Sequence, residues 1–152
     1  MKDEIDGVKN ALRNASVLSY VRDADIFITE NEYLIPNSVK SHAIGVKDGR
    51  EIRRELPGGM MERTINVKVI AYVQLVKPGA ALMGDAAGKK GILEMSHDID
   101  TVLDENLLDI DGMQSAFCRD IEESDTIGDD DTGDVFVKKT MLYEYVKEEE
   151  RP

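Results

Sequence analysis

Residues 62–76 constrain the fold more than any other segment, because they read ERTINVKVIAYVQLV. Apolar side chains occupy every second position of this run. Since successive side chains of a strand point to opposite faces, the spacing predicts one long strand with a continuous apolar face. The residues of that face are Ile65, Val67, Val69, Ala71, Val73 and Leu75.

The opposite face of this strand changes character along its length. Thr64, Asn66 and Lys68 are polar. Ile70 and Tyr72, farther along, are apolar and aromatic. We therefore expect the first half to be solvated on one face and the second half to be covered on both. Helices before and after the strand in sequence are expected to supply the cover, which makes it the central strand of a small sheet.

Neighbouring patterns predict the rest of the domain. Apolar residues at helical spacing predict amphipathic helices over residues 3–15 and from Gly91 to about Asn106. Runs rich in β-branched or aromatic residues predict strands at 24–29, 112–121 and 134–146. The fold class is therefore α+β. We expect a single domain over 1–152, with a mixed, mostly antiparallel sheet, two helices packed against it and an extended β-hairpin.

The hairpin is predicted over residues 40–61. Asp48-Gly49 offers the two positive-φ positions of a tight turn, between strands at 39–47 and 50–56. The second arm has few apolar residues among its charges, so we expect the hairpin to project from the core. Pro57-Gly58-Gly59 is expected to end it.

Three further segments lack the periodicity of helices or strands. Residues 77–91 are rich in glycine and alanine, which predicts a flexible loop. Residues 122–134 carry seven carboxylates and no basic residue, which predicts a solvated acidic loop. Residues 147–152 are charged and expected to fray.

Charge limits the class of partner. The chain has 31 acidic and 19 basic residues, a formal charge of −12. Its overall field opposes nucleic-acid binding, which depends on Lys and Arg neutralising phosphates. The segment from Lys40 to Lys68 nevertheless carries seven basic and four acidic residues, so its balance is +3 and that of the remainder −15. This pattern favours a basic face docking on an acidic face of a second copy, with chance unevenness on a solvated surface as the alternative.

Cys118 is the single cysteine, so an intramolecular disulfide and a secreted disulfide scaffold are excluded. The N-terminal residues contain no apolar run of signal-peptide length, and no apolar stretch reaches the length of a membrane span. We expect a soluble protein with no membrane contact that stays in the compartment where it is made.

Motifs for phosphate and calcium binding are incomplete. The run from Gly84 to Lys90 resembles a phosphate loop, but its glycine spacing is one residue short and Lys90 stands where a magnesium-binding hydroxyl is needed. Asp129, Asp131 and Asp134 resemble part of a calcium loop that lacks the glycine at its sixth position and the glutamate at its twelfth. We expect no cofactor.

Catalytic and metal-binding residues are not indicated either. His42 and His97 have no neighbouring Cys or His at the spacing of metal ligands. Cys118 belongs to no nucleophile motif. We expect surface histidines, no metal site and no catalytic residue.

Seven residues are candidate contacts to another subunit or partner. The hairpin supplies exposed arginines. Methionine and leucine side chains stand in glycine-rich segments, where a single chain has little reason to place them, and methionine adapts to irregular partner surfaces. The alternative is that these loops fold back on their own core. The candidates are Arg50, Arg53, Arg54, Met60, Met61, Leu82 and Met83.

The order of these elements resembles that of the tail terminator (tail-completion) proteins of long-tailed bacteriophages. The likeness covers nearly the whole chain and rests on layout. Its parts are the helix DEIDGVKNALRNA, the strand INVKVIAYVQL, the helix ILEMSHDIDTVLDENL and the closing strand FVKKTMLYEYVKEE.

This resemblance implies a structural virion protein, assembled in the bacterial host cytoplasm and located in the tail or neck. Copies would form a hexameric ring on the end of the tail tube, stop its polymerisation and join the tail to the head. The partners would be other copies, the tail tube protein and the head-side connector, with DNA passing through without specific binding. A head-to-tail ring needs two different complementary patches on each subunit, and we expect Arg50, Arg53 and Arg54 to pair with carboxylates of the next subunit.

Other functions stay open. The first alternative is another phage neck or head-tail joining protein, which would occupy a different place in the virion but have the same physical properties. An acidic DNA mimic that inhibits a nucleic-acid-binding enzyme would need carboxylates spaced along one surface, whereas here seven are bunched in one loop and a basic arm interrupts the rest. An enzyme with an unrecognised site is the third alternative.

Overall fold

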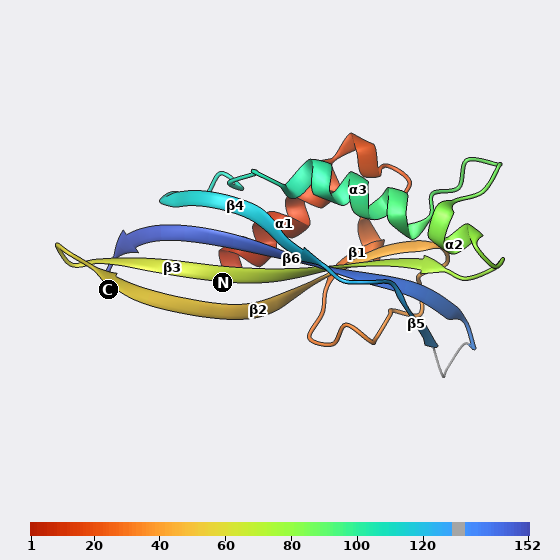
Figure 1. Ribbon diagram of the computed structural model, residues 1–152, viewed down its shortest axis with the longest axis horizontal. Coiled ribbons are helices and arrows are strands. Elements are labelled where there is room, and N and C mark those ends of the chain that lie inside the picture. The colour runs from red at the N-terminus through yellow and green to blue at the C-terminus, as the bar shows by residue number, and fades with distance from the viewer. Residues whose placement is uncertain (129–132) are drawn as a thin grey trace.

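Three long strands form the centre of the molecule. They are β2 (His42–Leu56), β3 (Met60–Gln74) and β6 (Val135–Glu150), and β3 runs antiparallel to both of its neighbours. The computed structural model describes residues 1–128 and 133–152. In Figure 1 these strands run nearly the whole length of the molecule, which makes the sheet long and twisted.

Three shorter strands complete the sheet. The order is β1-β2-β3-β6-β4, where β1 is Ile26–Ile28 and β4 is Met113–Ile121. β5 (Asp125–Gly128) pairs with the first residues of β6, next to the stretch that β4 occupies. Only the β1–β2 pairing is parallel among the described strands. The prediction of an α+β fold with a mixed, mostly antiparallel sheet is confirmed.

Both predicted helices pack on one face of this sheet. They are α1 (Lys2–Asn14) and α3 (Ile92–Leu103). In Figure 1 α3 lies above the strands, and α1 passes partly behind β6 toward it. Their apolar stripes meet the sheet in one main core, to which the helices contribute Val8, Leu12, Ile92, Met95, Ile99 and Leu103. Short helical turns lie at Ser16–Leu18, Asp23–Asp25 and α2 (Ala80–Met83).

The apolar face of β3 lies where its alternation predicts. Ile65, Val67, Val69 and Ala71 are each 0% exposed, and Val73 is 1% exposed. All five belong to the core under the helices, and Leu75 is partly buried against it. Burying this face removes a continuous apolar stripe from water, which is the main stabilising contribution of the strand.

The second face of β3 is half solvated and half covered, as predicted. Thr64, Asn66 and Lys68 are partly exposed, whereas Ile70 and Tyr72 are 0% exposed. The expectation that helices cover both faces is wrong. This second core is closed by the irregular segment 29–41, which Figure 1 shows beneath the sheet.

Specific contacts hold that segment against the sheet. The Tyr72 hydroxyl donates a 2.6 Å hydrogen bond to the Glu32 carbonyl, and the Val39 side chain joins the second core. Lys138 Nζ, on buried β6, lies 3.8 Å from a Glu32 carboxylate oxygen. A segment without helical periodicity can therefore cover a face when polar anchors hold its backbone.

The predicted turn at Asp48-Gly49 is wrong. β2 continues through both residues, and its pairing with β3 shifts between Asp48 and Glu51, which marks a β-bulge. A Cβ on Gly49 would lie 2.8 Å from the Asn66 carbonyl oxygen, so glycine serves close backbone approach. The hairpin turn is at Pro57-Gly58-Gly59, where both glycines have positive φ.

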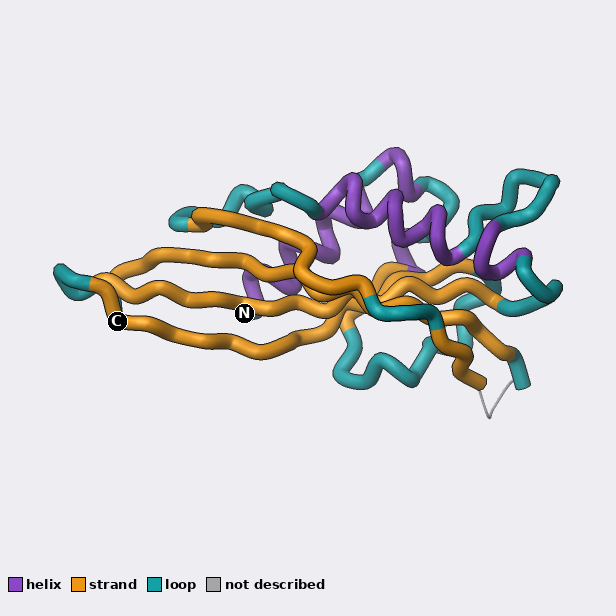
Figure 2. Tube along the Cα trace, in the orientation of Figure 1, coloured by secondary structure: helices purple, strands orange, loops and turns teal. Residues whose placement is uncertain are grey.

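The hairpin is also less isolated than predicted. β6 accompanies β3 along its whole length, from Phe136 opposite Gln74 to Glu150 opposite Met60. The predicted fraying of residues 147–152 is therefore wrong as far as Glu150. Figure 2 shows the strands continuing together to the turn at the far end of the sheet.

The two predicted loops contain regular structure. Segment 77–91 includes α2, and its glycines at 79, 84 and 88 have positive φ. The predicted acidic loop at 122–134 includes strand β5, since pairing with β6 supplies the order that local charge disfavours. Residues 129–132, and with them Asp129 and Asp131 of the incomplete calcium loop, lie outside the described residues.

Candidate functional site

The most densely paired charges of the molecule lie on the far half of the sheet. We call this half the distal arm. It comprises residues 48–56 of β2, 60–68 of β3 and 142–150 of β6. The inner part of this arm still packs under α1, where Ile65 and Val67 are buried, and the tip of the arm extends beyond the helices at the left side of Figure 1.

Arg63 joins the three strands of the distal arm. Its Nε donates to Glu51 Oε1 at 3.0 Å and its Nη1 donates to Glu149 Oε1 at 3.0 Å, while Nη2 also contacts Glu51. The guanidinium side chain is only 13% exposed. A partly buried arginine held by two carboxylates fixes the arrangement of β2, β3 and β6.

The carboxyl pKa values of this cluster reflect the arginine. Burial, the largest influence, raises the pKa of Glu51, but hydrogen bonds and positive charge from Arg63 and Arg53 lower that pKa overall. Burial likewise raises the pKa of Glu149, and Arg63 and Lys147 lower it overall. Both carboxylates are therefore ionised in the folded arm at neutral pH.

Acidification is expected to destabilise the distal arm. A carboxyl group whose pKa is lower in the folded chain stabilises the fold above its unfolded pKa, and this contribution is lost as pH falls through the folded pKa. The ordinary value for these groups is 4.5. We expect the urea concentration at the midpoint of unfolding to decrease when the pH is lowered below 4.5. The Glu51→Gln variant should be less stable than the wild type at neutral pH, and its stability should change less on acidification. Glu30→Gln is the control, because Glu30 is exposed and lies away from the arm. If the wild type and both variants lose the same stability on acidification, Glu51 does not stabilise the arm as a carboxylate.

The three candidate arginines lie along β2 of the distal arm. Arg53 Nε donates to Glu51 Oε2 at 3.0 Å, and Arg54 Nη2 donates to Glu62 Oε2 at 3.2 Å. Their side chains are 60% and 68% exposed, so these pairs contribute little to stability. Arg50 is exposed and makes no ion pair within the described part of the chain.

The four apolar candidates lie at two opposite ends of the sheet. Met60 is partly exposed at the tip of the distal arm. Leu82 and Met83, 37% and 65% exposed, belong to α2 at the other end, on the right in Figure 1. Met61 is only 4% exposed, because the fold of its own chain covers it, so it cannot offer a contact surface.

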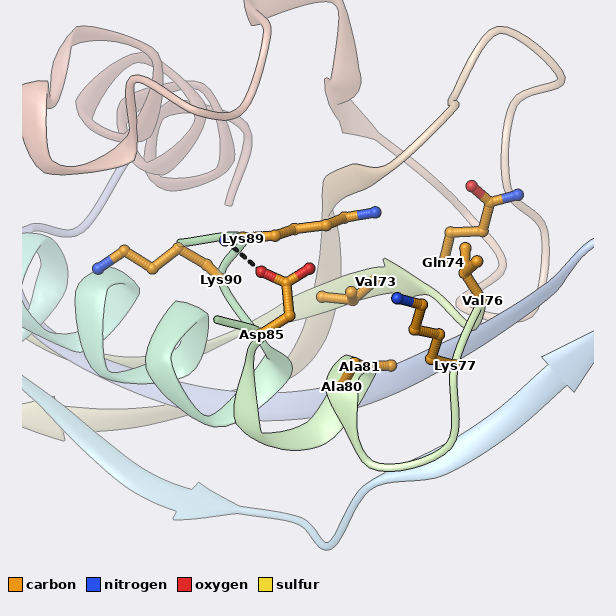
Figure 3. Close-up of a pocket in the computed structure, with 9 residues that line it drawn as sticks. All are labelled: Val73, Gln74, Val76, Lys77, Ala80, Ala81, Asp85, Lys89 and Lys90. Atoms are coloured by element: carbon orange, nitrogen blue, oxygen red, sulfur yellow. Dashed lines mark hydrogen bonds between the residues drawn. The ribbon is translucent and has the colours of Figure 1, made fainter. Parts of the chain in front are cut away.

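A shallow cavity of about 90 Å³ lies between α2 and the end of β3 (Figure 3). Lys77, Lys89 and Lys90 stand around it with Asp85. The Asp85 Oδ1 atom accepts the backbone N–H groups of Ala87 and Lys89, at 3.0 and 2.9 Å. The loop therefore satisfies internally the backbone donors that a phosphate loop directs at its ligand.

The two histidines and the cysteine differ in their exposure. His42 is buried, contrary to the expectation of a surface residue, with Nε2 2.7 Å from the Lys90 carbonyl oxygen and Nδ1 2.8 Å from Ser41 Oγ. His97 is exposed on α3. Burial raises the pKa of the Cys118 thiol, so a smaller fraction of it is the nucleophilic thiolate at neutral pH.

The described residues offer neither a metal-binding cluster nor a membrane-spanning helix. Within residues 1–128 and 133–152, no cluster of three or more His, Cys, Asp or Glu side chains could hold a metal ion. None of the helices described is both long enough and apolar enough to cross a membrane.

Inspection of the sequence missed the Arg63 cluster. Arg63 stands opposite Arg53 on β2 and opposite Lys147 on β6, a register that follows once the hairpin turn is placed at residues 57–59. Placing that turn at Asp48-Gly49 instead separated Arg63 from the carboxylates that hold it. A turn placed at residues 57–59 would have predicted that Arg63 lies near Glu51 and Glu149.

Comparison with known proteins yields a likeness in fold. No family model matches the chain, and no curated protein matches it. Among solved structures, the chain resembles one in the structure of the virion of a native gene transfer agent (GTA) particle, with a TM-score of 0.55 and 10% sequence identity. The match covers 93% of each chain, so the two share a fold over nearly their whole length.

Proposed function

We propose that this chain is a structural protein of a phage-like virion. The observation that carries the proposal is the fold shared with a virion chain over 93% of both lengths. A match of that extent spans nearly the whole fold, rather than one common substructure. No covalent chemistry is assigned to the chain in this role.

Within the virion, we propose the place of a tail terminator. Copies form a hexameric ring on the end of the tail tube, end its polymerisation and offer a surface to the head-side connector. Two features support this role. The chain carries a basic segment and an acidic remainder, which a head-to-tail ring can use as complementary patches. Its net charge of −12 also disfavours DNA adhering to a central channel.

The contacts to the tube and the connector come from opposite ends of the sheet in this proposal. Met60 at the tip of the distal arm and Leu82 with Met83 on α2 are the accessible apolar candidates. Apolar side chains at both ends of an elongated subunit suit a ring held between two different partners. Arg50, Arg53 and Arg54 serve contacts between neighbouring subunits.

Imaging of tails tests the proposed place. In particles that lack this protein, we expect tubes of uncontrolled length without heads, and added protein to restore tubes of uniform length. Tubes of normal length that merely lack heads indicate a neck or head-tail joining protein instead. Normal, fully joined particles without the protein overturn a role in the tail or neck.

Mass measurement in solution complements imaging. Size-exclusion chromatography with light scattering should detect a species of about six subunits, either alone or after addition of tube protein. A chain that stays monomeric and displaces DNA from a nucleic-acid-binding enzyme supports the DNA-mimic alternative.

A further inference from the structure

The sheet covers two of its edges with its own chain. On β1, Arg13 Nε and Nη2 donate to the Ile26 carbonyl oxygen at 3.2 and 2.7 Å. On β4, the Glu105 N–H donates to the Ala116 carbonyl at 2.9 Å, and the Cys118 N–H donates to Asp104 Oδ1 at 3.1 Å. These contacts occupy backbone groups that would otherwise attract another strand.

One long edge is left open. β1 pairs with β2 only from Ile44 to Val46, and the Thr29 N–H adds a last bond to the Val46 carbonyl at 2.9 Å. From Lys47 to Leu56, the outer side of β2 has no strand partner among the described residues. Alternate N–H and C=O groups of this stretch point away from β3. We call residues 47–56 the open edge.

The open edge carries four basic and three acidic side chains and one exposed apolar residue. Ile52 is 52% exposed, and Arg53 and Arg54 follow it directly. Arg50 has no ion-pair partner in the described residues. Arg53 and Arg54 are held only by exposed pairs with Glu51 and Glu62. A partner for this edge therefore needs carboxylates that reach Arg50 and compete for these two arginines, beside an apolar contact.

The opposite side of the same sheet has this character. Exposed carboxylates flank or belong to β4, and Arg119 is the single basic residue among them. Two apolar side chains lie on this strand, Phe117 and Ile121, 36% and 45% exposed. We call this surface the acidic edge; its carboxylates are Asp104, Glu105, Asp109, Asp111, Asp120, Glu122 and Glu123.

We propose that the open edge of one copy docks on the acidic edge of the next copy. This inference rests on the proposed ring, for which it names the subunit contact. The strand order places β2 and β4 toward opposite sides of the sheet, so the contact is head-to-tail and leaves both patches available for propagation around a ring.

Side chains carry this contact. Asp104 and Glu105 already bond to backbone groups in the middle of β4, so a second strand cannot pair with β4 there. Carboxylates of the acidic edge instead accept hydrogen bonds from the arginines and from the outward N–H groups of β2. Ile52 packs near Phe117 and Ile121. Since the charges are solvent-exposed in the free chain, association should weaken as salt rises.

A charge-swap experiment tests the contact. One variant carries Arg50→Glu, Arg53→Glu and Arg54→Glu; the other carries Asp111→Arg, Asp120→Arg and Glu122→Arg. Each variant alone places like charges in the contact, and we expect its association to need at least about tenfold higher concentration than the wild type. In an equimolar mixture every contact again joins opposite charges, and we expect association to return.

Three exposed lysines away from both edges give a matched control. Lys40→Glu, Lys77→Glu and Lys89→Glu change the net charge by as much as the arginine variant, and we expect them to leave association unchanged. Sedimentation at low salt measures association, and circular dichroism checks that each variant is folded. Because the rescue uses two variants together, loss of folding in one cannot imitate it.

Several results overturn the inference. They are a wild type that stays monomeric at low salt even with tube protein present, variants that still associate alone, a mixture that does not recover, or a control that fails as the variants do. None of these changes the tail-imaging result, so failure of the subunit contact remains distinct from failure of the proposed virion role.

Discussion

Val69→Asp should leave the chain unfolded at room temperature. Val69 is 0% exposed and lies in the main core, opposite Val46 on β2 and Met141 on β6. Its neighbours in this core are apolar, so a carboxylate there would be buried among groups that cannot pair with it. Burying an unpaired charge is expected to cost roughly 5 kcal/mol or more, which is comparable to the whole stability of a domain of this size.

Lys68→Asp is the matched control, because Lys68 is the neighbouring residue on the solvated face of β3. It stands opposite Lys47, so an aspartate there creates an opposite-charge cross-strand pair. We expect a change within about 1 kcal/mol. Circular dichroism with urea unfolding compares the two variants. Similar stabilities would show that the assignment of the two faces is wrong.

Gly112→Ala is expected to destabilise the chain by about 3 kcal/mol. Gly112 precedes β4 with a φ of +81°, and a Cβ there would lie 2.3 Å from the Glu148 carbonyl oxygen. Its own carbonyl accepts the Glu148 N–H at 3.0 Å. An added methyl group therefore strains the backbone and forces β4 away from β6, which thermal unfolding measures directly.

Gly58→Ala separates the two causes. Gly58 has a φ of +80°, nearly the same as Gly112, but a Cβ there would meet no atom within 4 Å. We expect it to cost about 1 kcal/mol, the conformational penalty alone. Equal losses at the two glycines would contradict a steric role for the contact between Gly112 and Glu148.

Local patterns predicted most elements of this fold. The alternation in residues 62–76 identified β3 and its buried face, because side-chain direction in a strand depends only on position along the chain. The apolar stripes at Val8 with Leu12 and at Ile99 with Leu103 identified both helices in the same way. These predictions needed no knowledge of which segments pair.

Predictions that depended on pairing were less successful. Asp48-Gly49 suits a turn, but a glycine also suits a bulge where the backbone approaches Asn66, and the dipeptide does not distinguish the two. β5 formed in an acidic segment because β6 supplied its hydrogen bonds. The candidate site was only partly predicted: the exposure of Arg50 was foreseen, whereas Arg63, the buried Met61 and the open edge were not.

By itself, then, the sequence determined the two helices, the long alternating strand and its faces, and the separation of a basic segment from an acidic remainder. Only the tertiary structure decided that Pro57-Gly58-Gly59 is the turn and that segment 29–41 covers the second face. It also decided that the outer edge of residues 47–56 of β2 has no strand partner in the part of the chain that the structure describes. The reason is physical. Side-chain periodicity is fixed by local backbone geometry, whereas register, cover and edges depend on hydrogen bonds and packing between residues far apart in the chain.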